Sequence, residues 1–154
     1  MPSPTWQILT MERIITISPT TNRSVVERNG LSDEDIQALP LSASRAFESY
    51  RKTFLQDRQA IVKKALKILD GKKDELAKEL TEQMGRPISY TAKEITTAVA
   101  RGEYLLKISS DALSDTPGEP ESGFKRYIRK VPLGPVLILF AWNVSKKQIF
   151  RLVI

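Results

Sequence analysis

The chain has 154 residues, 41% of them hydrophobic, a formal net charge of +6 at pH 7, and neither cysteine nor histidine. Without cysteine these residues offer no disulfide, thiolate nucleophile or thiolate metal ligand, and without histidine they lack the commonest general base. The length indicates one domain, and the lack of cysteine is typical of a cytoplasmic protein. No apolar run reaches the roughly 18–20 residues of a membrane span, and Met1–Pro4 does not begin a signal peptide, so we expect no membrane partner.

A short β-hairpin is the first regular element that the sequence predicts, after a lead-in at residues 1–11 without periodicity. β-Branched residues are frequent in Arg13–Ser18 and again in Ser24–Arg28. Between them, Pro19–Asn22 consists of residues that favour turns. Two such strands around a turn predict an antiparallel pair ahead of the helical region.

The first helix is expected to begin at Ser32, whose side chain can cap it. Asp35 lies three residues later and completes a capping box. Pro40 lacks an amide hydrogen and its ring clashes with the preceding turn. The sequence therefore predicts a break at Pro40 and a restart at Ser42.

Three further helices are predicted from apolar residues at helical spacing, at Leu55–Leu69, Asp74–Met84 and Ser89–Leu113. The apolar residues expected to be buried are Ile61, Ala65, Leu66, Ile68 and Leu69, then Leu76, Ala77 and Leu80, then Ile95, Ala98, Val99, Tyr104, Leu105, Ile108 and Leu113. Gly85 is expected to end the second of these helices. Gly102, inside the third, predicts close packing against a neighbouring helix.

Lys63, Lys64 and Lys67 lie largely opposite the apolar face of their helix and supply much of the positive charge. Contacts to nucleic acid would call for aromatic or arginine side chains nearby, which this face does not offer. A solvated lysine face is therefore the favoured interpretation, and we expect no nucleic-acid partner.

The C-terminal part predicts a loop at residues 114–123 and two strands. Phe124–Val131 alternates as in a strand with one solvated face, whereas Val136–Phe140 is continuously apolar, as in a parallel strand covered on both faces. Ligands of open α/β sheets bind at the carboxyl ends of such strands, where Trp142 and Asn143 stand. From the residues alone, a strand-end cap is the favoured interpretation of Asn143.

Several local strings, taken in order, are similar to strings of a known family. They are Ile17–Thr21, Ala46–Phe47, Asp57–Arg58, Asp74–Ala77, Glu82–Pro87, Glu94–Ile95 and Pro132–Ile138 followed by Trp142–Asn143. Over residues 12–143 the chain thereby resembles the N-terminal part of the NAD(P)-dependent aldehyde dehydrogenases. The resemblance implies an α/β family fragment, mostly α-helical as present, with an N-terminal β-hairpin and two C-terminal strands. The last strand would be the first strand of a truncated Rossmann-like NAD(P)-binding domain.

The resemblance also implies a site. Leu139, Phe140, Ala141 and Trp142 would line the nicotinamide riboside end of NAD or NADP, and no metal is implied. Asn143 would donate its side-chain N–H to the oxyanion formed from the aldehyde, a role whose loss typically lowers the rate ~10²–10³-fold.

The family's catalytic cysteine, its glutamate and most of its cofactor site lie downstream of the Trp-Asn pair. The resemblance therefore predicts an aldehyde dehydrogenase by descent that is inactive alone and does not bind the cofactor. The alternative is a non-catalytic fragment that associates with full-length homologous subunits. Residues 144–154 do not match the family pattern, and Val144–Ser145 can be encoded by bases that commonly begin an intron, which leads to the hypothesis of a translated intron.

Overall fold

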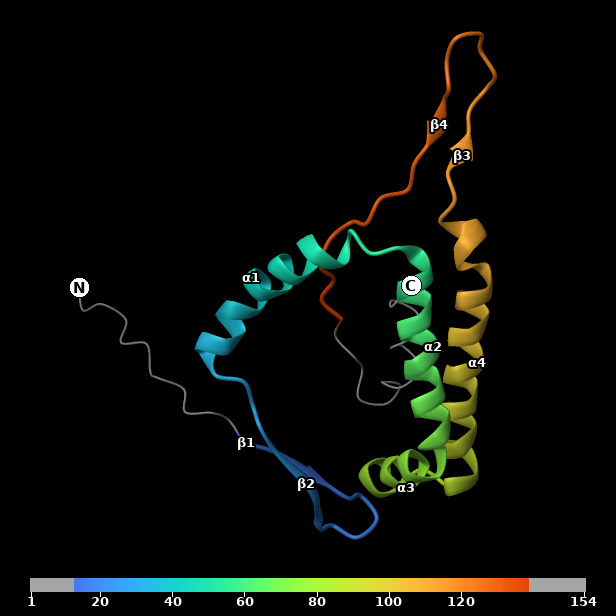
Figure 1. The fold of residues 1–154 in the computed structure, drawn as a ribbon. Helices are drawn as coiled ribbons and strands as arrows, with labels where there is room; N and C mark the ends of the chain where they lie inside the picture. The colour runs from blue at the N-terminus through green and yellow to red at the C-terminus, as the bar shows by residue number, and fades with distance from the viewer. Residues whose placement is uncertain (1–12, 139–154) are drawn as a thin grey trace, which may run out of the picture.

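A computed structural model describes residues 13–138, which are mostly helical with two small antiparallel strand pairs (Figure 1). The elements in order are β1 (Arg13–Ile17), β2 (Ser24–Asn29), α1 (Asp33–Tyr50), α2 (Leu55–Gly71), α3 (Lys73–Met84), α4 (Ile88–Ala112), β3 (Thr116–Pro117) and β4 (Tyr127–Ile128). The predicted element order from the hairpin through the four helical segments is confirmed.

The predicted hairpin forms from β1 and β2, in a register that pairs Arg13 with Asn29 and shifts after Thr16. Its turn is closed by the backbone N–H of Ser18, which donates to the Arg23 carbonyl at 2.8 Å. Asn22 takes a left-handed conformation with φ of 55°, which asparagine tolerates better than most residues. The turn residues therefore act as the sequence predicted.

Helix α1 begins as predicted but does not break at Pro40. The Asp35 N–H donates to the Ser32 hydroxyl at 3.1 Å, and the capping box is complete. The prediction of a break is wrong, because α1 runs continuously through Pro40. Proline removes only one intrahelical hydrogen bond. Since none of the described residues of α1 is buried, water can solvate the carbonyl that loses its partner.

The core lies where α2 and α4 run side by side, with α3 crossing their lower ends (Figure 1). Val62 and Leu66 of α2 meet Ala98 of α4 in this core. Ile95, 0% exposed, is buried on the same side of α4. Gly102 allows the closest approach of the two helices: a Cβ there would lie 2.5 Å from Leu66 Cδ2. The predicted close packing at Gly102 is confirmed.

Several residues predicted to be buried are exposed instead. In α2 these are Ile61, Ala65 and Ile68, whereas Val62, which we did not predict, is buried. Tyr104 in α4 and Leu113, just after its end, are also exposed. Periodicity identifies which residues share a helix face, but the partner helix decides which face is covered.

The C-terminal strands are shorter than predicted. Instead of a strand over Phe124–Val131, a strand forms only at Tyr127–Ile128, which pairs with Thr116–Pro117 from the predicted loop. Phe124 makes an isolated bridge with Glu121. The described residues 136–138 form no strand, and Leu137 is 83% exposed. A parallel strand needs a neighbour for its hydrogen bonds, and no such neighbour is present among the described residues. Exposed apolar side chains such as Leu137 favour self-association of the chain.

Candidate functional site

The predicted site residues, Leu139, Phe140, Ala141, Trp142 and Asn143, lie outside the described residues. What the structure describes is the segment that leads to them, from Pro132 to Ile138. Gly134 has a φ of 133°, which favours glycine. Pro132 and Gly134 line a cavity against α1, α2 and α4. The cofactor and oxyanion roles of residues 139–143 therefore stay predictions.

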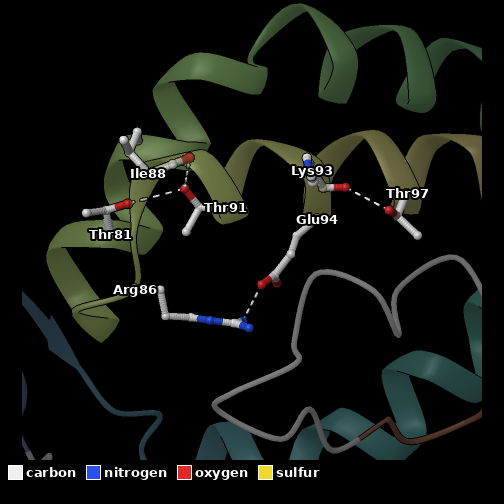
Figure 2. A network of polar contacts seen from close by, with 7 residues as sticks. All are labelled: Thr81, Arg86, Ile88, Thr91, Lys93, Glu94 and Thr97. Carbon is white, nitrogen blue, oxygen red and sulfur yellow. Dashed lines mark hydrogen bonds and ion pairs between the residues drawn. The ribbon is translucent and has the colours of Figure 1, made fainter.

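A partly buried ion pair joins two parts of the helical region (Figure 2). The Arg86 guanidinium, in the connection from α3 to α4, pairs with the Glu94 carboxylate of α4. Glu94 is only 7% exposed, whereas the Arg86 side chain is 41% exposed. A charge so buried needs its partner, so this pair fixes the α3–α4 connection to the first half of α4.

Two threonines join the same corner (Figure 2). The fully buried Thr91 hydroxyl donates to the Ile88 carbonyl at 3.0 Å and shares a hydrogen bond of 3.2 Å with the Thr81 hydroxyl. Gly85 ends α3 with a φ of 67°, and a Cβ there would lie 2.9 Å from Pro19 Cγ. The corner therefore holds α3, α4 and the hairpin turn together. Its chemistry is that of a support rather than of a reacting group.

A second set of hydrogen bonds ties α2 to the end of α4. The Gln59 amide donates to the hydroxyls of Ser109 at 2.7 Å and Ser110 at 3.1 Å. Ser109 is buried and donates to the Leu106 carbonyl at 2.8 Å. These contacts fix the end of α4 nearest to the β3–β4 pair.

Asp115 and Arg129 form an exposed ion pair beside β3 and β4. Arg129 donates to Asp115 through Nε and through an Nη atom at 2.8 Å. Hydrogen bonding from Arg129 holds the pKa of Asp115 below its ordinary value, and Asp115 in turn raises the pKa of Arg129. Because the pKa of Asp115 is lower in the folded state, the pair contributes to folding stability at pH values above the unfolded-state pKa. This contribution to stability is lost as the pH falls through the folded-state pKa.

No group of three or more acidic, histidine or cysteine residues that could hold a metal ion occurs within residues 13–138. In the same described range, no helix has the length and apolar content needed to cross a membrane. The described geometry therefore consists of helix packing, supporting polar contacts and the segment toward residues 139–143.

Residues 6–153 match the sequence model of the aldehyde dehydrogenase family, and the chain belongs to this family. The matched range continues past Asn143, where the string resemblance ends, into residues 144–153.

Two similar relatives are semialdehyde dehydrogenases. The chain is 26% identical over 140 residues to succinate-semialdehyde dehydrogenase [NADP(+)] 1 of Mycobacterium tuberculosis, a match covering 90% of this chain and 31% of that protein. It is 28% identical over 133 residues to 3-succinoylsemialdehyde-pyridine dehydrogenase of a Pseudomonas species, covering 86% of this chain and 27% of that protein. The chain thus spans less than a third of the length of these relatives.

The fold is likewise shared with solved aldehyde dehydrogenase structures. The structure of 3,6-anhydro-L-galactose dehydrogenase in complex with NAP aligns with a TM-score of 0.81 at 18% identity, covering 92% of this chain and 30% of that chain. At this identity the likeness concerns the fold alone.

Sequence reasoning missed the role of the Arg86–Glu94 pair, although both residues stand in strings that resemble the family. The available signal was the position of Glu94 in the helix. It is adjacent to Ile95 and four residues before Ala98, within the stripe that packs on the neighbouring helices. A charge in a buried stripe calls for a partner, and Arg86 is the one that the structure supplies.

Proposed function

We propose that this chain is the N-terminal part of an enzyme that oxidises an aldehyde to a carboxylic acid with NAD or NADP. The observation that carries the proposal is the family match over residues 6–153. Both relatives are named as semialdehyde dehydrogenases, and one name includes NADP(+). These names support an aldehyde substrate and a nicotinamide cofactor.

In this proposal residues 139–143 hold the reacting groups. Leu139, Phe140, Ala141 and Trp142 would line the nicotinamide riboside end of NAD or NADP, and the nicotinamide would supply the hydride acceptor. Asn143 donates its side-chain N–H to the oxygen that becomes an oxyanion, and such a donor contributes most where charge develops in the transition state. The Arg86–Glu94 ion pair joins the α3–α4 connection to α4 and is assigned no part in the chemistry.

The 154 residues contain no cysteine, so the proposed chemistry lacks its thiolate nucleophile here. We expect no formation of reduced nicotinamide when the purified chain is mixed with succinate semialdehyde and either NAD or NADP, as followed by absorbance. An Asn143→Ala variant should give the same baseline. Turnover by this chain, lost in Asn143→Ala, would contradict the expected inactivity while supporting the assigned role of Asn143.

A second candidate function, as a non-catalytic partner of full-length homologous subunits, is favoured by one feature. Apolar side chains at the strand pairs are exposed, including Ile14 and Ile17 in β1 and Ile128 in β4. Unpaired strand edges with apolar side chains are suited to pairing with another chain.

Co-expression tests this alternative. If the fragment co-assembles, a tagged full-length semialdehyde dehydrogenase should retain this chain through affinity purification, and Ile128→Lys should reduce the retained amount several-fold. Lys64→Glu, on the exposed face of α2, serves as the matched surface control. Equal retention of both variants, or none of the unmodified chain, would argue against association through β4.

A further inference from the structure

A small cavity lies between the C-terminal end of α1, α2 and the segment Pro132–Gly134. Its volume is about 190 Å³. Leu55, Val62 and Leu106 give it apolar walls, and Phe47 and Tyr50 of α1 lie at its border. Two guanidinium groups, those of Arg51 and Arg58, also line it.

The two arginines differ in how their charges are compensated. Arg51 pairs with Glu48 at 3.6 Å and lies over the Phe47 ring at 5.4 Å. The Arg58 Nε atom is buried, and it has no hydrogen-bond partner among the residues that the structure describes. Within the same residues Arg58 also forms no ion pair. A buried N–H on a cation without an acceptor is unfavourable, and the described residues leave Arg58 Nε without one.

The start of α2 adds to the positive character of the cavity. Arg58 lies near the N-terminal end of α2, where unpaired backbone N–H groups favour anions. Phe54, the N-cap residue, supplies no side-chain hydrogen bond to this described helix end. Asp57 is the acidic residue in the first turn, and it forms no ion pair with Arg58 in the described structure.

A second, adjoining cavity also has Arg58 in its wall, together with Lys130 and Pro132. Lys130 does not neutralise the charge of Arg58 and does not compete with it for an anion, because the Lys130 Nζ donates to the Ala112 carbonyl at 2.7 Å. Arg58 therefore stands between two hollows as the cation whose Nε has no acceptor within the described residues.

We propose that the cavity between α1, α2 and Pro132–Gly134 binds a small organic carboxylate. The carboxylate accepts hydrogen bonds from Arg58, whose planar guanidinium matches two carboxylate oxygens. The apolar body of the ligand packs against Leu55, Val62 and Leu106. These apolar walls favour a carboxylate with a hydrocarbon body over inorganic phosphate, which offers nothing for them to cover. The proposal is independent of the proposed function.

Ligand-detected saturation-transfer NMR on the complete 154-residue chain tests the site, with benzoate as the probe. We expect saturable binding that is at least tenfold weaker in Arg58→Gln and intermediate in Arg58→Lys, which keeps the charge but not the planar fork. Arg101→Gln is the matched control, because Arg101 lies on α4 over the Tyr104 ring and outside the cavity. Far-UV circular dichroism verifies that the variants keep their helices.

Two comparisons on the unmodified chain keep the proposal falsifiable even if Arg58→Gln fails to fold. Benzamide, an uncharged analogue of benzoate, should bind at least tenfold more weakly than benzoate. Inorganic phosphate should displace benzoate only at concentrations at least tenfold higher than benzoate itself requires. Equal binding of benzamide would show that the cavity recognises only apolar groups, and equal competition by phosphate would show a general anion site. Either result overturns the proposal. Unchanged benzoate binding in a folded Arg58→Gln variant overturns it as well.

Discussion

Gly102→Val is expected to lower the free energy of unfolding by about 3 kcal/mol, the upper end of the usual cost of overpacking. A Cβ at this position already lies 2.5 Å from Leu66 Cδ2 and 3.0 Å from Cδ1, and valine adds two methyl groups. Leu66 is 3% exposed and packs on Val62 and Ala98, so it cannot turn away without disturbing the core. Urea unfolding followed by far-UV circular dichroism measures the effect, with an osmolyte present if the starting stability is low.

Leu66→Ala tests whether the collision is the cause. Alone it should cost about 2–5 kcal/mol, as large-to-small core substitutions do. In the Gly102→Val background it should cost much less, since it removes the side chain that valine meets; residues in contact are not additive. Gly71→Val, where nothing lies within 4 Å of an added Cβ, is the control. Additive losses from Gly102→Val and Leu66→Ala would show that the two sites do not collide.

Arg86→Ala is expected to be the more damaging half of the Arg86–Glu94 pair to remove, at about 2 kcal/mol. It leaves the buried Glu94 carboxylate without its cation, and breaking a fully buried pair costs roughly 3–5 kcal/mol. The partial exposure of Arg86 reduces that figure. Glu94→Gln should cost less, because the amide oxygen can still accept from Arg86 and the guanidinium that loses its counterion is partly exposed.

The same unfolding measurement distinguishes two causes of the loss: the missing attraction between Arg86 and Glu94, and the burial of an unpaired Glu94 carboxylate. If the buried carboxylate is the cause, the double variant Arg86→Ala with Glu94→Leu should be more stable than Arg86→Ala alone. Arg126→Ala provides the control, since Arg126 pairs with Glu121 where both side chains are about half exposed and such surface pairs contribute roughly 0–1 kcal/mol. A double variant less stable than Arg86→Ala would show that Glu94 supports the fold by other contacts.

The elements that the sequence predicted well are those whose signals are local. The capping box at Ser32 and Asp35, the helix end at Gly85 and the hairpin turn after Ser18 form from residues close together in the chain. Such features need no knowledge of distant partners. Gly102 belongs with them because a glycine inside a helix calls for a packing reason.

The wrong predictions depend on partners elsewhere in the chain. The exposed Ile61 and the buried Val62 are neighbours in sequence, and only the position of α4 decides which of them is covered. The strand expected at residues 124–131 is reduced to Tyr127–Ile128, because its partner strand, Thr116–Pro117, is itself only two residues long and Phe124 makes only an isolated bridge with Glu121. The break predicted at Pro40 does not occur, because α1 is exposed and water can solvate the carbonyl that loses its hydrogen bond.

The candidate site could be predicted only through resemblance. From the residues alone Asn143 is better explained as a strand-end cap than as an oxyanion donor. It lies outside the described residues, so its role stays a prediction. Arg58 was noted only as part of a similar string; its unpaired Nε is a property of three-dimensional packing. No sequence pattern reports that a hydrogen-bond donor lacks an acceptor.

Three of the main packed pairs join consecutive elements: β1 with β2, α3 with α4, and β3 with β4. The fourth, α2 with α4, reaches across α3 and includes contacts 50 residues apart, such as that of Gln59 with Ser109. Contacts between consecutive elements form rapidly, because little chain entropy is lost in closing the loops between them. As the polypeptide leaves the ribosome, each consecutive pair can therefore assemble soon after its second member emerges. Such early assembly would bury the α3–α4 seam during synthesis and limit the time in which a chaperone could bind it.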